Sequence, residues 1–188
     1  SAGKVPGSVG SSYYVDEQNG YTRIATTNYT YSYSIYSDAK QGFDNYKSGD
    51  DNTTANALYV LDSGMNMVGK AENIAPGENI YSVRYDGAYA YLCTFRQIDP
   101  LFVYDLSNPG APKKLSELKL PGFSEYLHVW SDGRLFGLGQ SATDEGRVTG
   151  MKMVMFDISD KANVTAASSL ELGEGYSEAL YNPHAILI

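Results

Sequence analysis

Short apolar runs that end in aspartate recur along the chain and predict buried β-strands. The three clearest runs are Ala57–Asp62, Leu101–Asp105 and Met153–Asp157. Each is apolar on consecutive residues, which indicates strands that are covered on both faces of their sheet. Helical periodicity is not convincing anywhere in the sequence. The pattern therefore favours an all-β chain built from repeats.

Tight-turn dipeptides precede these runs, at Asn19-Gly20, Asp86-Gly87 and Asp132-Gly133. Such pairs are the strongest short-range signal for a β-hairpin, because the turn requires residues that tolerate a positive φ. With a hairpin before each apolar run and a more polar strand after it, every unit is interpreted as four strands. Units of ~40–50 residues with four strands are typical of β-propeller blades.

We therefore predict an all-β fold, a β-propeller of four-stranded antiparallel blades, present here as an incomplete run of about three and a half blades. A sandwich is disfavoured because it leaves one sheet face in water and its strands alternate. Propellers close with about 4–8 blades, so we expect a fragment that self-associates through its open blade faces. The expected blades span 12–74, 75–121 and 122–173, followed by the first hairpin of a further blade at 174–188 and with an inserted loop at 28–56; the last hairpin uses a strand at Tyr176–Tyr181 and a turn at Asn182-Pro183.

The composition excludes several classes of function. The formal net charge of −8 repels phosphate groups, which argues against nucleic acids and anionic membranes as partners. No apolar run approaches the ~20 residues of a membrane-spanning helix. Cys93 is the single cysteine, so neither an internal disulfide nor a Cys-rich metal site is expected. The two histidines have no motif around them that would indicate a catalytic triad.

Several long segments resemble one known group of proteins: the bacterial and archaeal secreted proteins with a carboxy-terminal β-propeller distantly related to WD-type repeats. The resemblance covers most of the chain from Tyr14 onward and implies an exported, cell-surface propeller, but it supplies no functional residues. Because Ser1–Lys4 contains no apolar stretch, we expect any signal peptide to lie upstream of this chain. The segments that carry the resemblance are Ala75–Arg84, Thr94–Ser107, Glu117–Ser124 with Tyr126–His128, Gly146–Gly150, Phe156–Asp160 and Tyr176–Tyr181.

The long connections between strands predict a candidate ligand-binding face. Tyr29, Tyr31 and Tyr33 alternate with polar residues, so they share one face of an extended arm. Such a face suits a protein or sugar partner; alternatively, it packs on neighbouring blades. Arg96 and Asp99 bracket another connection on this side of the fold, where a salt bridge or a turn cap is the alternative to a ligand contact.

Three glutamates at the starts of expected inner strands form a candidate metal site. Glu125 and Glu178 occupy equivalent positions in two repeats, and Glu78 lies near the matching place in the unit before. Carboxylates at one height could bind Ca²⁺. The alternative is that they are hydrogen-bonded or solvated polar residues, and no other cofactor is expected.

The leading functional hypothesis is a non-catalytic extracellular binding or scaffolding domain, with a protein or carbohydrate partner at the cell surface. The first alternative is a hydrolase or lyase of extracellular polymers that uses acidic residues over the propeller channel. An enzyme should show a deep pocket with a carboxylate whose pKa is raised by burial. A binding domain should show exposed aromatic side chains over a broad face. The remaining alternative is a structural propeller that contacts other parts of its own chain.

Overall fold

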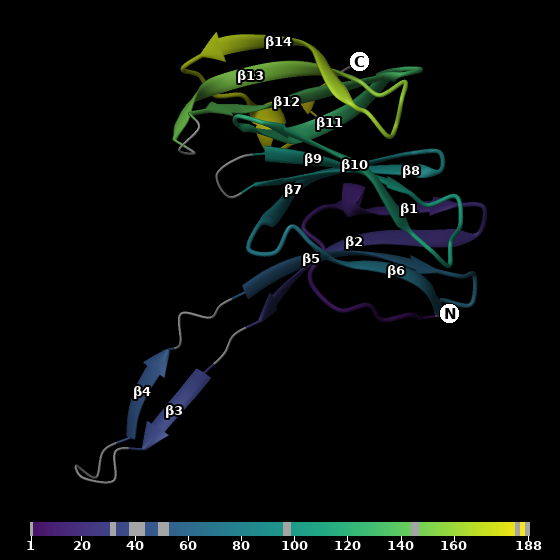
Figure 1. Cartoon of the computed structure of the whole chain (residues 1–188), viewed down its shortest axis with the longest axis vertical. Helices are drawn as coiled ribbons and strands as arrows, with labels where there is room; N and C mark the ends of the chain where they lie inside the picture. The colour runs from purple at the N-terminus through teal and green to yellow at the C-terminus, as the bar shows by residue number, and fades with distance from the viewer. Residues whose placement is uncertain are drawn as a thin grey trace.

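Three four-stranded antiparallel sheets are stacked one on another in the computed structural model (Figure 1). The structure describes residues 2–30, 33–37, 44–48, 53–95, 99–143, 147–182 and 185–186, without the side chains of Thr30, 33–37, 44–48 and Asp99. In each sheet the spatial order of the strands follows their order along the chain. The predicted fold class, an all-β run of propeller blades, is confirmed. The sheets are β1 (Val15–Gln18), β2 (Tyr21–Thr30), β5 (Thr53–Leu61) and β6 (Met67–Ile74); β7 (Asn79–Asp86), β8 (Tyr89–Phe95), β9 (Asp99–Asp105) and β10 (Lys113–Leu120); and β11 (Phe123–Ser131), β12 (Arg134–Ala142), β13 (Val148–Asp157) and β14 (Thr165–Gly173).

The three predicted tight turns each join the first two strands of a sheet. Asn19 has a φ of 53° and Gly20 a φ of 78°, the left-handed geometry that such a hairpin needs. Gly87 and Gly133 also have positive φ at the second turn position. The hairpins expected from these dipeptides are confirmed.

The aspartates at the ends of the apolar runs stop the strands and turn the chain. The backbone N–H of Ser107 donates to Asp105 Oδ1 at 2.8 Å, and that of Ser159 donates to Asp157 Oδ1 at 3.0 Å. Such side-chain to backbone bonds compete with strand pairing and favour turns. The residue between each pair, Leu106 or Ile158, is then buried in the core.

The hydrophobic core lies between the sheets. Leu58 of the first sheet packs in one buried cluster with Leu92 and Phe102 of the second. Tyr91 and Val103, on the opposite face of the second sheet, pack in another cluster with Phe156 of the third. The central strands are therefore covered on both faces, as their unbroken apolar runs predicted.

Two segments differ from the expected organisation. The stretch Tyr176–Tyr181 does not form a strand; it contains a short 3₁₀ helix, η2 (Glu178–Leu180). The backbone hydrogen bonds of this stretch are local: the N–H groups of Tyr181 and Asn182 both donate to the Glu178 carbonyl. Because these two N–H groups are already bonded, they do not pair with a neighbouring strand.

The loop expected at 28–56 contains regular structure. Its ends belong to β2 and β5, and between them β3 (Tyr33–Ser37) pairs with β4 (Asp44–Ser48) as a two-stranded antiparallel sheet. In Figure 1 this hairpin extends away from the stacked sheets. Within the part of the chain that the structure describes, no helix is long and apolar enough to cross a membrane.

Candidate functional site

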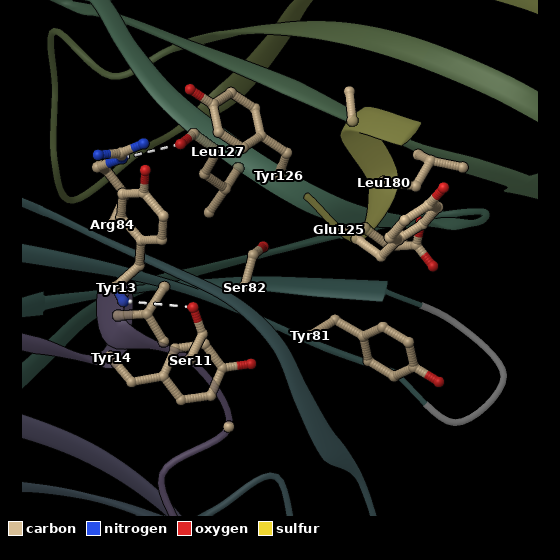
Figure 2. Close-up of a pocket in the computed structure, with 14 residues that line it drawn as sticks. Ser11, Tyr13, Tyr14, Tyr81, Ser82, Arg84, Glu125, Tyr126, Leu127 and Leu180 are labelled. Carbon is tan, nitrogen blue, oxygen red and sulfur yellow. Dashed lines mark hydrogen bonds between the residues drawn. The ribbon is translucent and has the colours of Figure 1, made fainter. Parts of the chain in front are cut away.

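A pocket of about 220 Å³ opens where the first strands of the second and third sheets meet (Figure 2). Among the described residues, these strands, β7 and β11, make the most extensive contact between neighbouring sheets. The pocket is completed on one side by the 3₁₀ helix η1 (Ser12–Tyr14) and on another by η2. It is lined by Gly10, Ser11, Tyr13, Tyr14, Tyr81, Ser82, Val83, Arg84, Glu125, Tyr126, Leu127, Ala179, Leu180 and Tyr181.

Arg84 of β7 is fixed at one end of the pocket by contacts to two other elements. Its Nε donates to the Leu127 carbonyl of β11 at 2.8 Å. Its guanidinium carbon lies 4.8 Å from the ring centroid of Tyr13 in η1 and 5.7 Å from that of Tyr126 in β11. Cations over aromatic rings at such distances are stabilised by the ring quadrupole. Arg84 therefore holds η1, β7 and β11 together.

Hydroxyl groups reinforce the same junction. Ser82 donates to the Ser124 carbonyl at 2.6 Å, which joins β7 to β11. Tyr14 donates to the Ile80 carbonyl at 3.1 Å, and Tyr85 donates to the Tyr14 carbonyl at 3.2 Å. These bonds tie η1 to β7, so the wall of the pocket is held in a defined shape before any ligand binds.

Tyr126 extends the cluster to His128. The Tyr126 hydroxyl lies 3.2 Å from His128 Nδ1, and the two rings stack. Burial, together with the positive charge of Arg84, lowers the pKa of His128. Both effects favour the neutral imidazole, which stacks on the Tyr126 ring.

Glu125 lies at the other end of the pocket, on the opposite side from Arg84 in Figure 2. Its Oε1 accepts from Gln140 Nε2 at 3.3 Å, whereas Oε2 is buried without a hydrogen-bond partner. Burial raises the pKa of this carboxyl group, and the Gln140 bond offsets part of that rise.

Aromatic rings surround the Glu125 end of the pocket. Tyr81 packs against Phe123 at 4.7 Å and Phe95 at 5.9 Å between ring centroids, yet it remains 38% exposed. Burial and the negative charge of Glu125 raise the pKa of Tyr81. Both side chains line the same pocket. Tyr181 is 62% exposed and stacks on Tyr176 at 5.5 Å.

The residues predicted as a ligand-binding face are only partly described. Tyr29 is exposed near the end of β2, and its hydroxyl donates to Asn79 Oδ1 at 3.3 Å. Tyr33 belongs to β3 and Asp99 to β9, but their side chains are not described. Tyr31 and Arg96 lie outside the described residues. This face therefore stays a prediction.

The structure does not bring the three predicted metal ligands together. Glu78 accepts from Thr94 Oγ1 at 2.5 Å, and Glu178 accepts from Asn182 Nδ2 at 2.7 Å. Each glutamate, including Glu125, thus has a side-chain partner of its own. Among the described residues, no group of three His, Cys, Asp or Glu side chains could hold a metal ion. The arrangement matches the alternative of separately hydrogen-bonded polar residues.

Sequence reasoning missed Tyr81, Arg84 and Tyr126 as pocket residues. All three lie in segments that carry the resemblance, and they belong to the strands β7 and β11, which meet at the pocket. The sequence feature that could have indicated these residues is a bulky or charged side chain on the expected first strand of a blade. The pairing of Arg84 with Tyr13 and Leu127 crosses three elements, and no local spacing indicates it.

Comparison with known proteins agrees with the fold. A family described as "Beta propeller domain" matches residues 1–188. An "Uncharacterized protein" of the archaeon Archaeoglobus fulgidus is 40% identical over 98% of the chain, and "Uncharacterized protein MJ1554" of Methanocaldococcus jannaschii is 38% identical over 99%. The chain spans about a quarter of the length of these relatives (25% and 26%). Both relatives are archaeal, whereas the resemblance led us to expect bacterial and archaeal proteins. The chain belongs to the β-propeller domain family.

Proposed function

We propose that this domain is a non-catalytic binding module outside the cell and that its ligand, a residue of a cell-surface carbohydrate, occupies the pocket between β7 and β11. The supporting observation is the composition of the pocket, where the exposed rings of Tyr81 and Tyr181 share the lining with Arg84 and Glu125. Aromatic rings supply large contact area at low entropic cost, while fixed polar groups orient a ligand. The location outside the cell is part of the proposal and is supported by the resemblance to secreted proteins.

The geometry favours binding over catalysis. Glycoside hydrolysis uses two carboxyl groups at a defined separation across the scissile bond. Among the described residues that line the pocket, Glu125 is the single carboxylate. Glu178 is exposed and bonded to Asn182, outside the lining. The raised pKa of Glu125 is the observation that favours the alternative, a polymer-degrading enzyme, because a general acid needs that property.

A melting-temperature screen of the intact protein tests the proposal. The panel holds neutral, acidic and amino oligosaccharides of cell-surface polymers, and an increase of several degrees with one class is expected. Tyr81→Ala should abolish that increase, because the ring lines the pocket. Tyr29→Ala is the matched control, an exposed tyrosine outside the pocket lining.

The two variants also separate the pocket from the predicted tyrosine face. If Tyr29→Ala abolishes the increase and Tyr81→Ala leaves it intact, the ligand binds on the arm and the proposed pocket is wrong. Shortened products after incubation with any oligosaccharide would establish the enzyme alternative. An unchanged melting temperature across the whole panel would favour a protein partner or a structural role.

A further inference from the structure

We propose that the Glu125 end of the pocket binds an ammonium group of the ligand; this names the ligand class and rests on the proposed function. Two features carry it: a carboxylate whose Oε2 lacks a hydrogen-bond donor, and tyrosine rings that line the same pocket.

The carboxylate of Glu125 requires hydrogen-bond donors that the protein does not supply. Oε2 is buried without a partner, and Oε1 has one long bond from Gln140. A buried acceptor without a donor is costly. The last torsion of a glutamate side chain has a broad range of angles, so the carboxyl group can turn Oε2 toward the pocket when a donor arrives, in exchange for the long Gln140 bond.

An ammonium group meets this requirement better than a hydroxyl group. It carries three donors and a positive charge, whereas a hydroxyl supplies one donor and leaves the carboxylate charge uncompensated. The Tyr81 ring lines the same pocket as Glu125, and such a ring attracts a cation through its quadrupole (Figure 2). One carboxylate with an adjacent aromatic ring is thus suited to an organic cation.

The charges elsewhere in the domain are compatible with such a ligand. The formal net charge of −8 raises the local concentration of cations. Arg84, the one cationic side chain in the described pocket lining, is stacked with Tyr13 and bonded to Leu127. Figure 2 shows it on the far side of the pocket from Glu125.

Titration calorimetry with pairs of probes that differ in their ammonium group tests the inference. A glucosamine trisaccharide is compared with its fully N-acetylated counterpart, and N-acetyl-lysine amide with N-acetyl-norleucine amide. We expect the ammonium member of at least one pair to bind on the order of tenfold to a hundredfold tighter, the range of a charge-assisted hydrogen bond. A preference in the sugar pair indicates an amino sugar. A preference in the amino-acid pair alone indicates a lysine side chain, and the carbohydrate ligand of the proposed function is then wrong.

Two variants locate the effect. Glu125→Gln keeps the shape and an acceptor but removes the charge, so the preference should disappear. Glu17→Gln removes the same charge from an exposed residue of β1, outside the pocket lining, and should retain the preference.

Equal binding within both pairs would overturn the inference, as would a preference that survives Glu125→Gln. If the acetylated trisaccharide binds in a Tyr81-dependent way without any preference for its amino counterpart, only this inference fails. If no probe binds and the wider screen is also negative, the proposed function fails with it.

Discussion

At the scale of single residues, Arg84 is the side chain whose loss should cost the most at the pocket. Its Nε bond to Leu127 and its two ring contacts disappear in Arg84→Met, although the apolar stem remains. We expect the free energy of unfolding in urea to fall by about 1–3 kcal/mol. Arg134→Met is the matched control: Arg134 is 42% exposed and pairs with Asp157, so a loss below about 1 kcal/mol is expected. Equal losses would contradict the clamping role.

Glu125 makes a pH-dependent contribution to stability. Burial raises its pKa in the folded protein, and the groups that face it are Tyr81 of β7 and Gln140 of β12. The folded state therefore holds the proton to higher pH than the unfolded state. Between the two pKa values the unfolded state binds fewer protons, so stability falls as pH rises through this window.

Glu125→Gln should remove this slope, because glutamine does not titrate. The melting temperature of the wild-type protein is measured from acidic to neutral pH beside that of the variant. We expect the two curves to converge at acidic pH, with the variant more stable at neutral pH. Parallel curves would show that the Glu125 pKa is not raised.

At the scale of elements, a glycine in β6 permits two sheets to approach closely. A Cβ at Gly69 would overlap the carbonyl oxygen of Pro109, in the turn between β9 and β10 of the next sheet. Gly69→Ala should therefore lower the free energy of unfolding by about 1–3 kcal/mol, a typical cost of overpacking. In the control Gly110→Ala, the new Cβ lies 3.6 Å from Asn108 Oδ1, an ordinary contact. Chemical denaturation that shows equal losses for the two variants would contradict the close approach.

The elements were predictable where their cause is local. The Asn19-Gly20 turn and the Asp105 strand end depend on neighbouring residues, so the sequence pattern indicates them. A strand at Tyr176–Tyr181 would have required pairing with another segment. This strand does not form, because the backbone of the stretch makes local hydrogen bonds to the Glu178 carbonyl instead. The Arg84 contacts likewise depend on how the sheets stack. Fold class was thus accessible from the sequence, whereas the pocket required the three-dimensional arrangement.

At the scale of the whole molecule, the two ends of the stack differ. On the first sheet, Val5 packs against the cluster of Tyr59 and Leu61, and Ser8 pairs with Thr27 through two backbone bonds of 2.9 and 3.0 Å. A chain segment therefore covers that end. On the third sheet, Phe136, Met153 and Leu170 line a shallow hollow of about 260 Å³ beside the exposed Trp130. An apolar face of this kind favours association.

We therefore expect the chain to self-associate through the outer face of the third sheet. Leu170 is 58% exposed and Trp130 is 54% exposed, so burying them against a second copy removes apolar surface from water. Sedimentation velocity over a wide concentration range should show oligomers that Leu170→Lys shifts to monomer. Val68→Lys places the same charge on β6 of the first sheet and should leave the oligomers intact. A wild-type chain that stays monomeric and folded at every concentration would show that this face is stable in water, and the partner would then have to be sought at the pocket alone.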